Sequence, residues 1–401
     1  MVGVRGGVCR AGNGRNGAVA GLGWQSRGLC SLAAVAAILT ALPAQAENVP
    51  TGIPDPSIAT SLPPGLADPG RARAALASRG ITFGINYIGE VFGNASGGIT
   101  QGTYYNGRLE VAVAADLERL IGWRGLTFFA NGYQIYGESI SGEALGVLMP
   151  VSFIEATPAT RLFEIWLEQK LLDDHVTIRF GQLAADSEFI LSDGGGAFIN
   201  GTWGWPSITA TNLPQGGPAY PLATPGVRVA LMPNDNLTLM AGFYNGRPAG
   251  DCPDDADPQA CNDHGLDFPV DEPVLSMFEG AYRYEAAGLP GTIKLGGWHQ
   301  EGPHAHLFTG ALIEDSHGLY AILDQMVYRF AGPGTAQGIS VFGRVIGGPE
   351  DRSFIDMYWE AGLTATGLFP SRPDDMLGIG FAHSGISGGA SARQVADGDT
   401  V

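Results

Sequence analysis

The sequence predicts an all-β protein: an antiparallel, up-and-down transmembrane β-barrel. Short runs in which apolar and polar residues alternate recur about thirteen times along the chain. The connections between these runs are alternately long and short. In barrels of the outer membrane, lipid-facing and lumen-facing side chains alternate along each strand, and the loops are long on one side only. Both patterns therefore favour a barrel over a soluble β-sandwich.

The alternating runs define the expected strands. In 81–92, for example, Ile81, Phe83 and Ile85 share one face, and Thr82 and Asn86 share the other. The other expected strands are 107–116, 126–135, 161–171, 176–182, 227–232, 237–244, 274–284, 292–300, 318–330, 338–346, 354–367 and 376–384. The long connections are 93–106, 136–160, 183–226, 245–273 and 301–317, and the short ones are 122–125, 173–175, 233–236, 288–291 and 370–375.

The segments outside the expected barrel (81–384) have their own signatures. Residues 1–46 contain no acid and include an apolar run at 29–42 followed by Ala44-Gln45-Ala46. This is typical of a secretory signal peptide, and we expect cleavage after Ala46. Residues 47–80 form a Pro/Gly-rich leader with one short helix over 67–79, capped by Asp68. Residues 385–401 are expected to be an irregular tail.

Charge and composition exclude several classes of function. The predicted signal holds four of the 22 basic residues, which leaves 18 against 40 acidic ones, a net charge of −22. A protein with this acidic charge balance is not expected to bind nucleic acid, because phosphates require a basic surface. After the signal, no apolar run is long enough for a transmembrane helix. The remaining cysteines, Cys252 and Cys261, favour a local disulfide in an exported protein, with free thiols as the alternative.

The inner faces of the expected strands are rich in charged and aromatic residues. Guanidinium groups suit hydroxyl pairs, and aromatic rings suit the apolar faces of sugars. The alternative for each residue is an ion-pair network that supports the wall. We take as candidate channel-lining residues Arg108, Glu110, Glu164, Trp166, Glu168, Arg179, Arg228, Arg344, Asp356 and Glu360, with Trp203 and Trp205 from the loop at 183–226.

No catalytic or metal-binding motif stands out. Glu164 and Glu168 lie four residues apart on one strand face, about 13 Å at ~3.3 Å per residue, too far for a glycosidase pair, although cross-strand pairs stay open. His304 and His306 form a His-x-His that favours solvated loop histidines over a metal site. The acidic segment 251–263 lacks EF-hand spacing and favours a solvated loop over a calcium site. We expect no metal and no cofactor.

Several longer segments resemble the carbohydrate-selective outer-membrane porin family of the OprB type. The resemblance covers roughly 65–387. Its motifs are RARAALASRGITFGINY (71–87), GQLAADSEF (181–189), Gly-Trp-Pro (204–206), GGPAYPLATPGVRV (216–229), HGLDFP (264–269), LDQM (323–326), VFGRVIGGPEDR (341–352) and GLFPSRPDDMLGIGFAHSGIS (367–387).

The resemblance implies a Gram-negative outer-membrane channel that passes mono- and small oligosaccharides by facilitated diffusion, without turnover. It also implies that the loop at 183–226 folds inward and narrows the channel. Family members have sixteen strands and end on an aromatic residue, whereas this chain shows about thirteen strands and no such end. The alternative function is a sugar-binding or sugar-hydrolysing β-protein of the outer membrane or periplasm. Association into homo-oligomers is left open.

Overall fold

The computed structural model describes residue 54 and residues 57–253, 255–331 and 336–397. Residues 49–401 belong to one compact unit. The predicted signal peptide and its cleavage after Ala46 lie outside the described residues. Among the residues that are described, no helix is both long and apolar enough to cross a bilayer.

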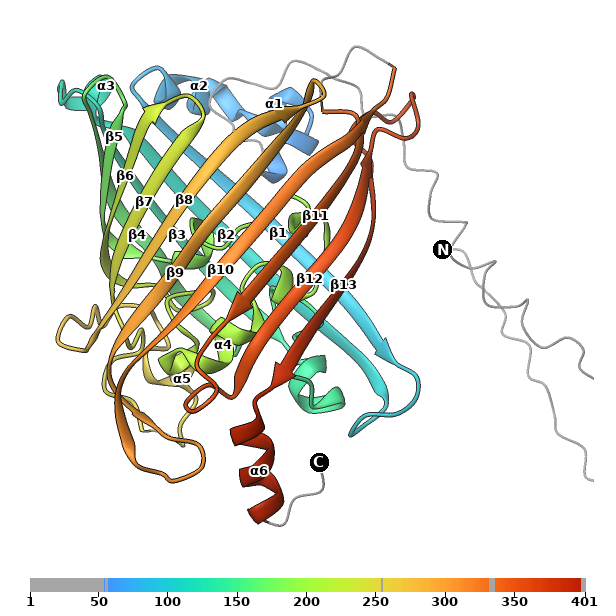
Figure 1. The fold of residues 1–401 in the computed structure, drawn as a ribbon. Helices are drawn as coiled ribbons and strands as arrows, with labels where there is room; N and C mark the ends of the chain where they lie inside the picture. The colour runs from blue at the N-terminus through green and yellow to red at the C-terminus, as the bar shows by residue number, and fades with distance from the viewer. Residues whose placement is uncertain (1–53, 55–56, 254, 332–335, 398–401) are drawn as a thin grey trace, which may run out of the picture. The chain divides into compact units, whose positions relative to one another are not determined.

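The unit is built on one antiparallel sheet of thirteen strands in which each strand pairs with its neighbour in sequence. The sheet curls around an interior that holds part of the chain (Figure 1). This confirms the predicted fold class. β1 and β13 form the two edges, and no pairing between them occurs in the described sheet. The strands are β1 (Ile81–Asn94), β2 (Gly102–Asp116), β3 (Leu126–Gly137), β4 (Ala159–Leu171), β5 (Val176–Leu183), β6 (Thr224–Asn234), β7 (Leu237–Asn245), β8 (Val274–Ala286), β9 (Leu289–Ala305), β10 (Leu312–Arg329), β11 (Gly338–Gly347), β12 (Ile355–Thr366) and β13 (Met376–Ile386).

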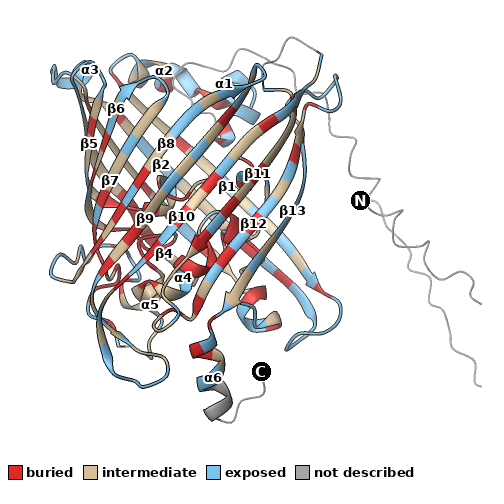
Figure 2. Ribbon diagram, in the orientation of Figure 1, coloured by how far each residue is buried: buried red, intermediate tan, exposed pale blue. Residues whose placement is uncertain are grey.

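Alternation along the strands separates two faces of the sheet. On β10, Leu319 is 72% exposed, whereas the next residue, Tyr320, is 4% exposed. Figure 2 shows exposed residues alternating with buried or half-buried ones along many of the strands. A large apolar side chain costs about 1.5–3 kcal/mol when it is left in water. A whole face of such side chains, including Leu295 and Ile379, is therefore suited to lipid.

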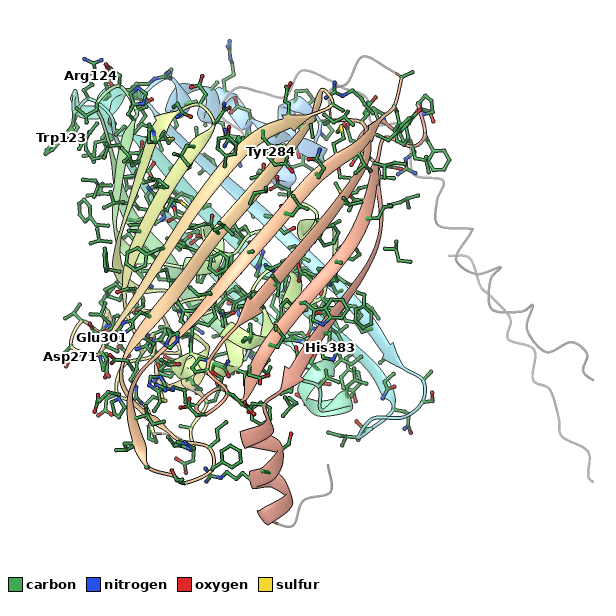
Figure 3. The ribbon with its side chains drawn as sticks, in the orientation of Figure 1. Trp123, Arg124, Asp271, Tyr284, Glu301 and His383 are labelled. Carbon is green, nitrogen blue, oxygen red and sulfur yellow. A yellow bond between two sulfur atoms is a disulfide. The ribbon has the colours of Figure 1, made fainter. Side chains whose placement is uncertain are left out.

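Aromatic side chains mark both ends of this outer face. Trp123 and Tyr284 lie at the end of the sheet that carries the short turns, as Figure 3 shows. Trp359 stacks on His383 nearer the long loops, with ring centroids 5.8 Å apart. Two bands of this kind flank the apolar band of transmembrane barrels. They agree with a sheet that spans a bilayer between its short turns and its long loops.

The leader and the tail differ from expectation. The predicted helix over 67–79 is broken, because Gly70 and Arg71 adopt positive φ, and only α2 (Ala72–Ala77) is a regular helix. Asp68 still caps α2, accepting a hydrogen bond from Arg73 N–H at 2.7 Å. The tail, expected to be irregular, contains α6 (Gly388–Asp397). Its Ala, Arg and Gln residues are good helix formers, which the Gly and Ser content concealed.

The remaining helical elements are short and lie in the leader and the connections. They are η1 (Ile58–Ser61), α1 (Pro64–Ala67), η2 (Pro69–Arg71), α3 (Leu117–Ile121), η3 (Ile140–Leu145), η4 (Ala185–Ser187), η5 (Gly195–Ala197), η6 (Gly201–Trp203), α4 (Ser207–Asn212), η7 (Pro214–Gly216) and α5 (Pro258–Cys261).

The β7–β8 loop is folded onto the edge of β4. Cys252 and Cys261 are joined by a disulfide. Leu162 N–H donates to the His264 carbonyl at 2.9 Å, and the buried Arg161 guanidinium donates to the Asn262 carbonyl at 2.5 Å. These bonds complete the backbone pairing of β4 beyond the end of β5. The loop thus closes the wall at the level where the chain leaves β5 for the interior.

Replacing Gly265 with alanine should release this loop. Gly265 has φ +66°, and a Cβ there would lie 2.0 Å from the Leu162 carbonyl oxygen. We expect G265A to lower the free energy of unfolding by at least about 2 kcal/mol, measured by urea titration of the lipid-reconstituted protein. Gly93 is the control, because a Cβ there would meet nothing within 4 Å. Equal stability of G265A and G93A would contradict this docking.

Candidate functional site

The connection between β5 and β6, residues 184–223, is called here the inner loop. It lies inside the curl of the sheet, where α4 is visible (Figure 1). Its apolar residues pack against the inner faces of β7–β12, which turns this part of the lumen into a hydrophobic core rather than open space. The buried core comprises Leu183, Ala185, Phe189, Ile190, Ile208, Leu213, Tyr244, Leu275, Met277, Trp298, Tyr320, Ile322, Ile346, Ile355 and Tyr358.

A buried ion pair fixes the inner loop to the wall. The Arg344 side chain of β11 and the Glu360 side chain of β12 are both 0% exposed, and Nη2 of the arginine lies 2.7 Å from Oε2 of the glutamate. The same guanidinium donates to the carbonyls of Ile190 at 2.5 Å, Thr202 at 3.1 Å and Trp203 at 3.0 Å. One arginine thus binds two separate turns of the loop backbone. Two charged wall residues predicted to line the channel serve here as an anchor.

Further polar contacts extend this anchor along the wall. Lys294 Nζ donates to the Leu191 carbonyl at 2.7 Å. Asp324 accepts from Ser192 Oγ at 2.8 Å and from Gly194 N–H at 2.9 Å. Satisfied polar groups in a buried network hold one arrangement of a chain segment. The inner loop is therefore positioned on the β7–β12 side of the lumen.

A second charged network lies on the inner face of β4–β6. Glu168 and Glu188 each accept from Arg228 Nη2 at 2.7 Å, and Arg179 lies 3.0 Å from Glu168 and 2.6 Å from Glu188. The Arg179 guanidinium also lies 3.9 Å from the Trp166 ring centroid. These groups bind one another and tie Glu188, an inner-loop residue, to the wall.

The opposite side of the lumen holds a cavity of 440 Å³, called here the central cavity. It lies between the inner loop, β2–β4 and the β3–β4 loop. On the inner-loop side the cavity is lined by glycines, including Gly195, Gly196, Gly201 and Gly204. Because glycine has no side chain, the loop leaves this space open. Its larger lining side chains are Arg108, Tyr133, Phe153, Glu155, Phe163, Asp186, Trp205 and Tyr220.

Aromatic rings surround Arg108 in this cavity. The guanidinium carbon lies 4.8 Å from the Tyr133 ring centroid, 5.1 Å from that of Tyr220 and 5.6 Å from that of Phe153. Tyr133 and Tyr220 pack edge to face with centroids 5.5 Å apart. Such contacts hold a cation in place without neutralising it. The cavity therefore offers a fixed cation beside apolar faces.

Asp186 of the inner loop is the acidic counterpart in the central cavity. Its carboxylate accepts from Tyr220 N–H at 2.8 Å. Burial raises the pKa of Asp186 to about 6, although the Tyr220 N–H and the positive charge of Arg108 both favour the ionised form. Asp186 is thus charged at neutral pH and loses its charge under mildly acidic conditions.

The predicted channel-lining residues fall into different places. Arg108 and Trp205 line the central cavity. Arg179, Arg228, Arg344, Glu168 and Glu360 are bound in the ion pairs described above, and Trp203 is buried against Phe198 with ring centroids 4.5 Å apart. Glu164 is buried and accepts from Ala184 N–H at 3.1 Å. Asp356 lies half-buried on β12 beside Gly385.

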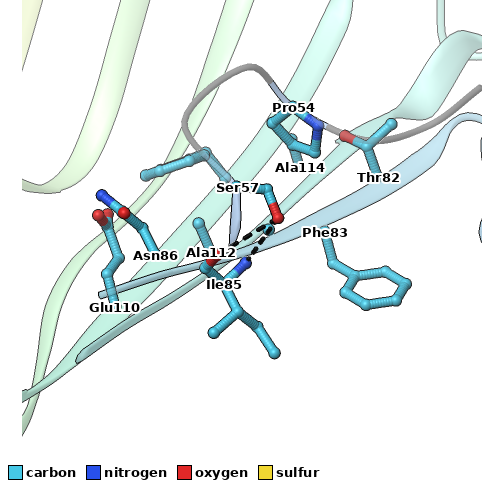
Figure 4. Close-up of a pocket in the computed structure, with 11 residues that line it drawn as sticks. Pro54, Ser57, Thr82, Phe83, Ile85, Asn86, Glu110, Ala112 and Ala114 are labelled. Atoms are coloured by element: carbon cyan, nitrogen blue, oxygen red, sulfur yellow. Dashed lines mark hydrogen bonds between the residues drawn. The ribbon is translucent and has the colours of Figure 1, made fainter. Parts of the chain in front are cut away.

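Glu110 lies in a separate cavity of 270 Å³ between the leader and β1–β3. Figure 4 shows this cavity, with the Ser57 hydroxyl bonded to the backbone of Ile85. Glu110 itself accepts from Asn131 Nδ2 at 2.8 Å. This second cavity lies toward the short-turn ends of the strands, whereas the central cavity lies beside the inner loop.

Sequence reasoning missed several residues of the central cavity. Tyr133, Phe153, Phe163, Tyr220 and Asp186 were not among the candidates. The inner-face position of Tyr133 follows from the alternation in β3. Tyr220 and Asp186 stand in the unusual 181–227 stretch, but nothing in their spacing shows that they meet Arg108.

Among the described residues, no group of three or more His, Cys, Asp or Glu side chains could hold a metal ion. Glu168 of β4 and Glu188 of the inner loop share Arg179 and Arg228 as partners.

An antiparallel transmembrane sheet with an inner loop beside a narrow lumen cavity defines the class of the protein: an outer-membrane porin. The model of the carbohydrate-selective porin OprB family matches residues 100–399, and the chain belongs to this family.

Individual relatives agree with this assignment. Porin B of Pseudomonas aeruginosa is 23% identical over 355 residues, which cover 82% of this chain and 75% of that protein. The high-pH structure of Pseudomonas putida OprB superposes with a TM-score of 0.74 at 20% identity, covering 83% of each chain. Its low-pH structure gives a TM-score of 0.50 at 18% identity, covering 79% of this chain and 81% of that one. At these identities the structures support the fold.

Removing the Arg344 anchor should widen the channel. Breaking a buried ion pair costs about 3–5 kcal/mol, because the remaining charge is left unpaired. We expect R344A to lose that much stability and to show higher, noisier single-channel conductance as the inner loop leaves the wall. R372A is the matched control, since the Arg372–Asp375 pair is 42% and 38% exposed and should contribute less than about 1 kcal/mol. A stable R344A channel of unchanged conductance would refute the anchoring role.

Proposed function

We propose that the protein is a passive channel for mono- and small oligosaccharides, with the central cavity as its narrowest and selecting section. The observation that carries this proposal is the arrangement around Arg108: a guanidinium framed by Tyr133, Phe153 and Tyr220 beside a cavity of 440 Å³. Guanidinium donors match sugar hydroxyls, and ring faces match the C–H faces of a pyranose. A cavity of a few hundred Å³ suits a small ligand.

Passage requires weak contact rather than tight binding. A solute must gain enough from the site to enter and little enough to leave. The inner loop supports this, because it is fixed against one wall and leaves a preformed opening along the other. Facilitated diffusion then needs no cofactor, no turnover and no moving gate.

The proposal extends to the surroundings of the channel. We infer that the protein is exported by the segment 1–46, cleaved after Ala46, and resides in the Gram-negative outer membrane with its long loops outside. The apolar outer face would contact lipid. The alternative, a sugar-hydrolysing β-protein, is less well supported, because Glu168, Glu188 and Glu360 are all bound to arginines.

Solute flux separates these functions. Proteoliposomes should swell in isosmotic neutral sugars at rates that fall steeply with solute size. Sugar cleavage without swelling would contradict the proposal and favour the hydrolytic alternative.

Phe153 provides a sharper test of the sugar contact. It is 39% exposed and lines the central cavity. Losing a ring contact of about 0.5–1.5 kcal/mol should weaken sugar block of the ion current about 2- to 10-fold. Conductance of F153A without sugar should be equal or higher, as measured in planar bilayers. F381A is the matched control, because Phe381 is 57% exposed on the outer face. Unchanged block in F153A would argue against an aromatic sugar contact there.

A further inference from the structure

Arg108 differs from three arginines of the inner wall, Arg179, Arg228 and Arg344, in lacking a carboxylate partner. Arg179, Arg228 and Arg344 each have a carboxylate within 3.0 Å. Within the described parts of the chain, no carboxylate lies within 4.0 Å of the Arg108 guanidinium, and its Nε has no hydrogen-bond partner. Its neighbours are instead the rings of Tyr133, Phe153 and Tyr220.

An uncompensated arginine in a narrow, partly desolvated cavity favours an anionic ligand. A guanidinium presents paired donors that match both oxygens of a carboxylate. A neutral sugar uses these donors only for hydroxyls, which bind more weakly than a charged acceptor. The arrangement therefore offers more to a carboxylated sugar than to its neutral counterpart.

We propose that the channel also conducts carboxylated sugars, with Arg108 as the carboxylate partner and Asp186 as the group that opposes them. This inference rests on the proposed function, since it concerns the same cavity. Asp186 lines that cavity together with Arg108. When ionised, it repels a passing carboxylate and partly offsets the field of Arg108. When Asp186 is protonated, the carboxylate left in the cavity lining is Glu155, whose oxygens accept hydrogen bonds from Ser139 and Ser141. The field of Arg108 is then less opposed.

The pKa of Asp186, about 6, sets the direction of the pH dependence. Above this pH the aspartate is ionised and carboxylated sugars are disfavoured; below it they are favoured. The other charged or titratable groups around Asp186 are held by partners or by the wall. They are Tyr133 of β3, Glu110 of β2, Glu155 of the β3–β4 loop, Glu164 of β4, and Glu188 and Tyr220 of the inner loop. Of these groups, Asp186 is the inner-loop carboxylate that lines the central cavity together with Arg108.

Acidic residues elsewhere oppose anions only at long range. The chain carries a net charge of −18, but exposed charges are screened over about 8 Å at physiological ionic strength. Inside the cavity, where Arg108 meets the solute directly, the local charge decides the preference.

The test compares galacturonate with galactose, released together from proteoliposomes whose membrane potential is clamped with potassium and valinomycin. Galacturonate stays ionised at both pH 7.5 and pH 5.0, since ordinary carboxyl groups titrate near or below about 4. We expect the flux ratio of galacturonate to galactose to rise about 3- to 10-fold from pH 7.5 to pH 5.0. D186N should give the high ratio at both pH values, and R108Q the low ratio at both.

A control on the same loop tests whether the loss of any carboxylate, rather than of Asp186 in particular, changes the flux ratio. Asp193 is exposed and does not line the central cavity, so D193N should titrate like the unmodified chain. Retention of the folded band on unheated gels establishes that each variant is folded. If galactose passes but the flux ratio of galacturonate to galactose does not change with pH, with D186N or with R108Q, this inference is overturned. The proposed function then still stands. Folded protein that passes neither sugar overturns both.

Discussion

The structure depends on one buried interaction, the ion pair between Arg344 and Glu360. It is the most deeply buried ion pair of the described residues, with both side chains 0% exposed, and it binds the inner loop to the wall. The guanidinium neutralises the charge of the glutamate. It also donates hydrogen bonds to three carbonyls of the inner loop, those of Ile190, Thr202 and Trp203. A buried charge that lost these partners would be strongly destabilising. The loop and the wall therefore order each other.

This anchoring divides the inner charges into two groups. Paired charges such as Arg228 with Glu168 build the wall and hold the loop. Arg108, beside Asp186 of the inner loop, has no carboxylate within ion-pair distance in the described part of the chain. Arginines with a carboxylate partner stabilise the wall, whereas Arg108 is the one that we propose to contact the solute.

The sequence predicted the wall better than the site. All thirteen strands lie where period-2 alternation placed them, because one face must meet lipid and the other the interior. The inward folding of the loop at 183–226 was implied by the resemblance to the porin family. Its anchors were not, since Arg344 and Ile190 are 154 residues apart and no local pattern records their meeting. Trp203 is buried whereas Trp205 lines the central cavity, a difference that their sequence surroundings do not record.

The most direct test of the account is chemical block at Gly196. This glycine lines the central cavity, and a side chain there would meet nothing within 4 Å. Cys252 and Cys261 form a disulfide and should not react. Treating Gly196→Cys channels with a bulky thiol reagent should abolish most of the ion current, whereas Gly93→Cys on the outer face should keep it. A fully labelled Gly196→Cys channel with undiminished current would show that ions take another route and would contradict the account.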